Sequence, residues 1–197
     1  MNQFFTFEGI DGSGKSTIID QVAKKLKEND YPVIITFEPT DTWLGQYVQQ
    51  QIKTQSDPFV TAFTFIADRI QHSKEIQKWL DQGNIVLCDR YAESTYAYQS
   101  VQLEKTVDNP VKWLQDLSKN RILTPDRTFY FQITADQALD RIKHRDELIS
   151  FEKKDFLQKV QRYYDEICKG NRFIRLDATQ NIEDLTKRCV IEILSKS

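Results

Sequence analysis

A short glycine-rich run near the start of the chain has the residue types and spacing of a phosphate-binding loop. Residues 9–16 read Gly-Ile-Asp-Gly-Ser-Gly-Lys-Ser, which matches the pattern G-x-x-x-x-G-K-[ST] directly after an apolar stretch. Glycines let backbone N–H groups turn inward around phosphate oxygens, and a following helix adds the positive end of its dipole. We expect Lys15 to reach the β- and γ-phosphates of a nucleoside triphosphate and Ser16 to offer its hydroxyl to Mg²⁺. The predicted contacts of the loop are Gly9, Ile10, Asp11, Gly12, Ser13, Gly14, Lys15, Ser16 and Thr17.

The alternative is a glycine-rich turn that matches the pattern by chance. The chain has only six glycines, and Gly9, Gly12 and Gly14 all fall within this one turn. Because glycine is otherwise sparse, the clustering is not a by-product of composition. The position of the run directly after a strand-like stretch also favours the phosphate site.

A second charged group follows another apolar stretch. Residues 85–88 read Ile-Val-Leu-Cys and lead into Asp89 and Arg90, at the edge of a parallel sheet where ligands bind. Asp89 can hold Mg²⁺ through water, and the planar, permanently charged Arg90 suits a bidentate grip on an acceptor phosphate. A surface ion pair is the alternative for such a dipeptide. Beside a phosphate loop, the pair favours phosphoryl transfer, with Lys15, Asp89 and Arg90 in catalytic roles and with Ser16 and Asp89 facing the metal.

The elements that must position these groups alternate between strand and helix patterns. Apolar, β-branched or aromatic runs predict strands over residues 4–7, 33–37, 85–88, 129–133 and 173–176. Helical spacing predicts helices over residues 16–27, 58–80, 134–145, 152–169 and 182–194. This alternation predicts an α/β fold of the P-loop nucleotide-hydrolase type, with a doubly wound, five-stranded parallel sheet flanked by helices. Residues 101–111 and 143–150 read as connections within a single domain over residues 1–197.

Composition excludes several classes of partner. The formal net charge of -2 and the pI near 5.8 give no overall attraction to nucleic acid or to anionic membranes. Three widely separated cysteines fit neither a disulfide framework nor a close-spaced zinc site. With no signal-like segment and no apolar run of the roughly 20 residues that span a bilayer, we expect a cytoplasmic protein.

Four segments together resemble the thymidylate kinase family. They read Phe-Glu-Gly-Ile-Asp-Gly at residues 7–12, Glu-Pro-Thr-Asp at 38–41, Phe-Ile-Ala-Asp-Arg at 65–69 and Asp-Arg-Tyr-Ala-Glu-Ser-Thr-Tyr-Ala-Tyr-Gln at 89–99. With the phosphate loop, the match runs from residue 5 to about residue 180. The resemblance implies ATP and dTMP as substrates, Mg²⁺ as the metal, dTDP as the product and a homodimeric assembly.

The resemblance also assigns the acceptor contacts. It implies that Phe65 stacks on thymine and that Arg69 binds the base edge, and i, i+4 spacing on one helix independently allows this. A helix that begins near Glu93 would bring Ser94 and Tyr98 to one face. The alternatives are that the Phe65 ring packs in the core and that the polar residues of the helix near Glu93 are solvent-exposed. The implied acceptor set is Asp11, Glu38, Phe65, Arg69, Arg90, Ser94, Tyr98 and Gln99.

Basic residues near position 145 resemble the family's lid over ATP, which we expect at about residues 141–154. The phosphate loop contains no arginine, so the resemblance implies that the lid supplies the cation that stabilises the transferring phosphoryl group. We expect Arg145 in that role and Arg141 beside the adenine. A solvated basic helix end is the alternative.

One stretch departs from the family pattern. Residues 40–52 contain no Lys or Arg, whereas relatives often place an arginine there, and Gln49 or Gln50 occupies the region. The chain would then rely more on Arg90 to bind the acceptor phosphate.

Three other functions fit parts of the pattern. A kinase for another acceptor, such as dUMP or a deoxynucleoside, would differ only in small contacts. A nucleotide-controlled switch is disfavoured because the chain lacks an Asn-Lys-x-Asp motif. A relative that binds nucleotide without turnover is the third, and acceptor-stimulated ADP formation separates all of them.

Overall fold

The computed structural model describes residues 3–142 and 151–195, and it contains one five-stranded, fully parallel sheet. The strands are β1 (Phe4–Glu8), β2 (Val33–Phe37), β3 (Ile85–Asp89), β4 (Arg127–Gln132) and β5 (Phe173–Asp177). Their order across the sheet is β2-β3-β1-β4-β5. All five predicted strands and the predicted α/β class are confirmed.

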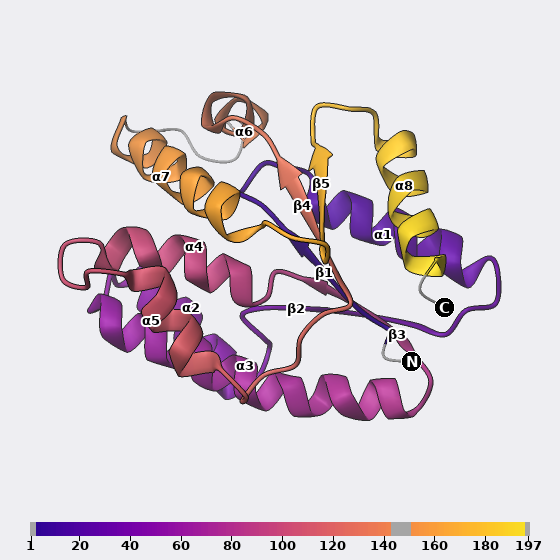
Figure 1. Cartoon of the computed structure of the whole chain (residues 1–197), viewed down its shortest axis with the longest axis horizontal. Helices are drawn as coiled ribbons and strands as arrows, with labels where there is room; N and C mark the ends of the chain where they lie inside the picture. Colours follow the sequence, from indigo (N-terminus) through magenta and orange to yellow (C-terminus); the bar gives the residue numbers. More distant parts are fainter. Residues whose placement is uncertain (1–2, 143–150, 196–197) are drawn as a thin grey trace.

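Eight helices surround this sheet in the described part of the chain. They are α1 (Lys15–Lys27), α2 (Trp43–Lys53), α3 (Pro58–Asp81), α4 (Ala92–Leu103), α5 (Pro110–Ser118), α6 (Ala135–Ile142), α7 (Phe151–Ile167) and α8 (Ile182–Leu194). In Figure 1, α1 and α8 lie together on one side of the sheet, while α3, α4, α5 and α7 lie on the other. Among the described helices, none is both long and apolar enough to cross a membrane.

The prediction that residues 101–111 form a connection was wrong at both ends. Helix α4 continues to Leu103, and α5 already begins at Pro110. The reason is local capping: Asn109 accepts a hydrogen bond from the backbone of Lys112, and proline fits the first turn of a helix. Helix α2 was also not predicted; Thr42 caps it by accepting from the Gly45 N–H.

Alternating strand residues separate the core into two faces. Phe5 and Phe7 are fully buried on the face that α1 covers, and Phe4 is buried on the face that α3 covers. Burial of each such ring contributes about 1.5–3 kcal/mol. This apolar packing offsets the cost of the polar groups buried at the strand ends, among them Glu8.

The order of the sheet decides where a ligand can bind. Strand β1 is central, and Phe7 pairs with Asp89 of β3 on one side and with Phe129 of β4 on the other. The chain leaves β1 into residues 9–14 and leaves β3 into Arg90, so both predicted motifs meet at the carboxyl edge. This is the crevice where open α/β sheets bind their ligands.

Candidate active site

The phosphate loop has the backbone conformation that its glycines permit. Gly9, Gly12 and Gly14 have φ angles of 145°, 85° and 87°. A Cβ atom at Gly12 would lie 2.3 Å from the carbonyl oxygen of Ala138, and one at Gly9 would lie 2.7 Å from that of Phe131. The first and second glycines are therefore required both by conformation and by close packing.

Lys15 is buried at the start of α1. Its Nζ atom donates to the Ile10 carbonyl over 3.3 Å. Burial and, to a smaller extent, the nearby charge of Arg90 lower the pKa of Lys15 to about 8, against the opposing effect of Asp89. A phosphate group would supply the negative charge that this desolvated ammonium group needs.

Ser16 and Asp89 meet between α1 and β3. The Ser16 hydroxyl donates to Asp89 Oδ2 over 2.5 Å, while Asp89 Oδ1 is buried and has no hydrogen-bond partner among the described residues. A hydroxyl next to an unsatisfied carboxylate oxygen is a suitable donor set for a hard cation beside phosphate. The structure thus brings the two predicted metal-facing residues together.

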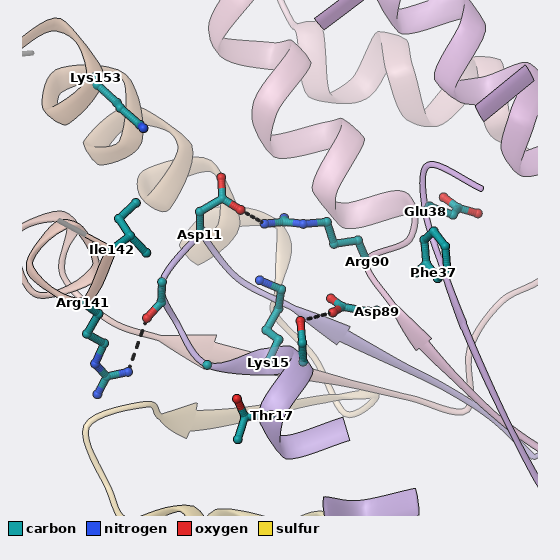
Figure 2. Close-up of a pocket in the computed structure, with 13 residues that line it drawn as sticks. Asp11, Lys15, Thr17, Phe37, Glu38, Asp89, Arg90, Arg141, Ile142 and Lys153 are labelled. Carbon is teal, nitrogen blue, oxygen red and sulfur yellow. Dashed lines mark hydrogen bonds and ion pairs between the residues drawn. The ribbon is translucent and has the colours of Figure 1, made fainter. Parts of the chain in front are cut away.

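A cavity of about 610 Å³ lies over the phosphate loop. Figure 2 shows Asp11, Lys15 and Arg90 facing one another across it, with Lys153 reaching in from α7. Arg141 closes one side, donating to the carbonyls of Gly12 over 3.4 Å and Ala178 over 2.9 Å. Its lining residues are Asp11, Gly12, Gly14, Lys15, Ser16, Thr17, Phe37, Glu38, Asp89, Arg90, Arg141, Ile142 and Lys153.

A second cavity, of about 360 Å³, adjoins the first. Asp11, Glu38 and Arg90 line both, so a ligand in one cavity would meet a ligand in the other at these side chains. Every residue predicted to contact the acceptor lines the second cavity. The full lining is Asp11, Glu38, Pro39, Ile52, Phe65, Arg69, Arg90, Tyr91, Ser94, Tyr98, Gln99, Gln102 and Phe156.

Arg90 occupies the junction of the two cavities. It has a φ of 67°, and its guanidinium group donates to the Gly9 carbonyl and to Ser94 Oγ, each over 3.1 Å. Its other terminal nitrogen pairs with Asp11 over 2.5 Å. Burial works to lower the pKa of Arg90, but Tyr98 and Asp11 raise it well above its usual value. The residue is a fixed positive charge aimed at the site.

Asp11 is the exposed partner of this charge. Burial alone would raise its pKa, but Arg90 and Lys15 hold the pKa below its usual value. The Tyr98 hydroxyl also points at Asp11, over 3.5 Å, and the Arg90 guanidinium lies 5.4 Å from the centre of the Tyr98 ring. An ionised carboxylate next to a fixed arginine can orient a sugar hydroxyl in the second cavity.

Arg69 lies in the wall of the second cavity and is almost completely buried. Its Nε donates to Glu38 over 2.8 Å, and its Nη2 donates to the Tyr91 carbonyl over 3.0 Å and to Thr95 Oγ1 over 2.7 Å. Among the described residues, Nη1 has no partner. That buried nitrogen is the one donor of the guanidinium group without a hydrogen-bond partner in the described part of the chain.

Sequence reasoning missed the groups that hold Glu38. His72 Nδ1 lies 2.9 Å from Glu38 Oε1, and its Nε2 lies 2.7 Å from the hydroxyl of Thr36. One turn back on α3, Asp68 accepts from the backbone and hydroxyl of Thr40. The available signal was the spacing on α3, where Asp68, Arg69 and His72 share the buried face with apolar residues.

The remaining walls of the second cavity are aromatic or amide groups. Phe65 is half-buried and is not among the buried residues of either apolar core. Gln99 is buried, and its Oε1 has no hydrogen-bond partner among the described residues. Phe156 of α7 packs against Tyr98 with ring centres 6.0 Å apart. Phe156 and Lys153 were not predicted, because nothing in the local sequence shows that α7 returns over both cavities.

The stretch at residues 40–52, which contains no Lys or Arg, contributes no cation to the lining of either cavity. Gln49 and Gln50 are exposed and line neither cavity. Helix α2 instead contributes Ile52 to the second cavity. Arg90 is the cation common to both linings. Arg145, expected in the lid, lies outside the described residues.

The parallel sheet, the glycine loop with its buried lysine and the carboxylate at the end of β3 define a P-loop nucleotide-binding protein with a second, adjoining ligand cavity. The family model described as thymidylate kinase matches residues 7–189. The chain belongs to the thymidylate kinase family, and the resemblance drawn from its motifs is confirmed.

Archaeal relatives match along nearly the whole chain. A probable thymidylate kinase of Methanosarcina barkeri is 37% identical over 196 residues, which cover 98% of this chain and 96% of the relative. One from Methanosarcina acetivorans is 38% identical over 200 residues, with 98% and 95% covered. One from Sulfurisphaera tokodaii is 36% identical over 195 residues, with 99% and 97% covered.

Proposed function

We propose that this chain is a thymidylate kinase that transfers the γ-phosphoryl group of ATP to dTMP and releases ADP and dTDP. One observation carries the proposal: the phosphate-loop cavity and the cavity lined by Phe65, Arg69 and Tyr98 adjoin and share Asp11, Glu38 and Arg90. A donor in the first cavity and a monophosphate in the second would meet with their phosphates at Arg90. Membership in the thymidylate kinase family supports thymine as the base.

The chemistry requires positioning and charge more than a strong base. A phosphate monoester has a second pKa near 6, so the attacking oxygen of dTMP is already anionic near neutral pH. That oxygen attacks the γ-phosphorus in line, the bond to the bridging oxygen of ADP breaks, and no covalent enzyme intermediate forms. Lys15 and Arg90 offset the negative charge on the two phosphates. Asp89 has a positioning role and does not act as a general base.

Mg²⁺ fits this arrangement. Ser16 and the unsatisfied oxygen of Asp89 would hold it, directly or through water. When bound, the ion offsets charge on the β- and γ-phosphates that would otherwise repel the acceptor.

The proposal extends to the lid and to the organisation of the chain. Residues 1–197 would form one kinase domain in the cytoplasm, with a lid at about 141–154 and with no nucleic-acid or membrane partner. Arg141 already contacts the phosphate loop and the segment after β5, which supports a place beside the adenine. The cation expected from Arg145 would complete the site on closure.

A homodimer is supported by an apolar surface on α2 and α3. Trp43 is 71% exposed and Phe63 is 50% exposed, and Tyr47 and Val60 are exposed on the same two helices. Large exposed apolar side chains of this kind are typical of protein contacts. Light scattering of the Phe63→Glu variant tests this proposal: a shift from dimer to monomer supports it, and a wild-type monomer contradicts it.

The activity is tested by ADP formation from ATP and Mg²⁺ with dTMP, dUMP, UMP, AMP, GMP or no acceptor. We expect strong stimulation by dTMP. Stronger stimulation by another monophosphate would overturn the base assignment of Phe65, Arg69 and Tyr98 but keep the phosphate chemistry. Hydrolysis that no acceptor stimulates would overturn the kinase assignment.

A further inference from the structure

Glu8 is a fully buried acid that the reaction described above does not use. It ends β1, immediately before the phosphate loop, and its side chain lies on the side of α4. Burial of an ionised carboxylate is expensive unless it is paired or fully hydrogen-bonded. No direct ion pair of Glu8 is found among residues 3–142 and 151–195, and hydrogen bonds hold the carboxylate instead. Because burial of this carboxylate costs free energy, we expect a role for Glu8 at the edge of the site.

The hydrogen-bond donors to Glu8 come mainly from the turn that carries Arg90. The Tyr91 N–H donates to Oε1 over 2.8 Å, and the Ser94 hydroxyl donates to Oε2 over 2.6 Å. Tyr164 of α7 adds a bond to Oε2 over 3.0 Å. Two of the three donors therefore belong to the segment that begins at Arg90.

Ser94 links Glu8 to the guanidinium group. Its single proton goes to Glu8, so its oxygen is free to accept from Arg90 Nη1, over 3.1 Å. The backbone of Arg90 lies in the left-handed region, a conformation that costs a residue with a side chain about 1–2 kcal/mol. The hydrogen bond from the Tyr91 N–H to Glu8 stabilises this conformation of Arg90.

We propose that Glu8 is a positioning residue that holds Arg90 in place for the acceptor phosphate, through Ser94 and the Tyr91 amide. The inference rests on the proposed function in that Arg90 binds the acceptor phosphate. Glu8 would contact neither substrate, and its loss would weaken the use of the acceptor more than the use of ATP.

The protonation state of Glu8 would alter this link. Burial and, to a smaller extent, Glu93 raise the pKa of Glu8 to about 7 against the opposing effects of Ser94 and Arg90. Once protonated, Oε2 can donate to Ser94 Oγ instead of accepting from it, and the Ser94 proton then turns to the Tyr164 hydroxyl, 2.7 Å away. Ser94 Oγ must then accept from both Glu8 and Arg90, which weakens its bond to the guanidinium group. The groups around Glu8 are Arg90, Tyr91, Glu93 and Ser94 of the turn and α4, Lys15 of α1, Cys88 of β3, and Tyr164 and Cys168 at α7.

The first test compares Glu8→Gln, Ser94→Ala and the double variant by kcat and KM for each substrate. The glutamine keeps an oxygen for the Tyr91 N–H but cannot accept from Ser94 on its nitrogen. We expect Glu8→Gln to raise KM for dTMP about tenfold, as for a lost hydrogen bond to a charged group, and to change KM for ATP less than about twofold. Because both residues act through one link, the double variant should be no worse than the worse single variant.

Additive effects, or equal losses for ATP and dTMP, would overturn the proposal. If Glu8→Gln does not fold, Ser94→Ala alone still tests the proposal. The matched control is Ser100→Ala, which removes another buried α4 hydroxyl, one without a hydrogen-bond partner among the described residues. We expect that control to leave KM for dTMP unchanged.

The second test is the ratio of kcat/KM for dTMP between wild type and Glu8→Gln from about pH 5.5 to about pH 8.5. The ionisation of dTMP itself is common to both proteins and cancels in the ratio. We expect a difference of about tenfold above pH 7 that shrinks toward acid pH, where wild-type Glu8 is also neutral. Parallel profiles would overturn the inference.

Failure of the proposed function gives a different result. If wild type uses another monophosphate better, the same ratios measured with that acceptor still test Glu8. If there is no turnover, calorimetric binding of dTMP to wild type and Glu8→Gln gives the comparison directly. Absence of dTMP binding to wild type would overturn both proposals.

Discussion

The two cavities are built in different ways. The phosphate cradle of the donor cavity is one continuous segment, residues 9–17, formed by its backbone and glycines. The acceptor cavity depends on side chains from α3, α4, α7 and the segment that follows β2, held by a buried network around Glu38 and Arg69. Substitutions in the first region should therefore act on catalysis with the fold intact, and substitutions in the second should act on stability and acceptor binding together.

The largest expected effect is the loss of Lys15. Lys15→Met removes the cation at the β- and γ-phosphates, and we expect kcat to fall about 10²–10³-fold, the range for loss of one electrostatic stabiliser. Because the lysine is a desolvated charge whose one hydrogen bond within residues 3–142 and 151–195 is to a carbonyl, the thermal midpoint should not fall. Steady-state kinetics and a melting curve measure the two quantities. Near-normal turnover in a folded variant would contradict the assignment of the phosphate loop.

Arg69→Ala should show the opposite pattern. In the described part of the chain, the change leaves His72 as the one partner of the buried Glu38 carboxylate. Removal of one partner of a buried pair destabilises by about 3–5 kcal/mol. We expect this loss in urea unfolding, together with weaker dTMP binding and little change in ATP binding. Unchanged stability with lost turnover would mean that Arg69 behaves like the donor-side residues, and the contrast between the cavities would fail.

The pH dependence of ATP binding sharpens the donor side. Lys15 has a pKa of about 8 in the free protein, and bound phosphates favour its charged form, so ATP binding above that pH must take up a proton. The dissociation constant should therefore rise about tenfold per pH unit above pH 8. Calorimetry at several pH values measures this, with Lys15→Arg as the control that stays charged. An equally steep rise in that variant would assign the effect to another group.

Gly45→Ala is the smallest of these perturbations. A Cβ at Gly45 would lie 1.9 Å from the Thr40 carbonyl oxygen, so the segment that follows Glu38 must shift. We expect an increase of several-fold in KM for dTMP, with a loss of about 1–3 kcal/mol from overpacking. Gly83→Ala is the matched control, because its Cβ would meet no atom within 4 Å although its φ of 83° is strained. Equal kinetic effects in both variants would remove the link between this packing and the acceptor.

The same contrast explains what the sequence could predict. The donor site was predictable, because its residues are neighbours in the chain and glycine, lysine and serine occur at fixed spacing. The strands were predictable because their buried residues form apolar runs. Helices α2 and α5 were missed where caps rather than periodicity set the start, at Thr42 and Asn109.

The acceptor side was predictable only in part. Family motifs pointed to Arg69, but its bond to Glu38 joins residues 31 positions apart, and local patterns do not report such pairs. Glu8 and Tyr164 are 156 positions apart, and their contact depends on the packing of α7 against α4. A charged residue at the end of an apolar strand, as Glu8 is, was the one available signal.

Transfer of label from [γ-³²P]ATP in the presence of dTMP and Mg²⁺ distinguishes phosphoryl transfer to dTMP from hydrolysis of ATP. We expect label to appear in dTDP, at the rate at which ADP forms, with little in inorganic phosphate. Label released as inorganic phosphate at the same rate with and without dTMP would contradict the assignment of the second cavity as a thymidylate site.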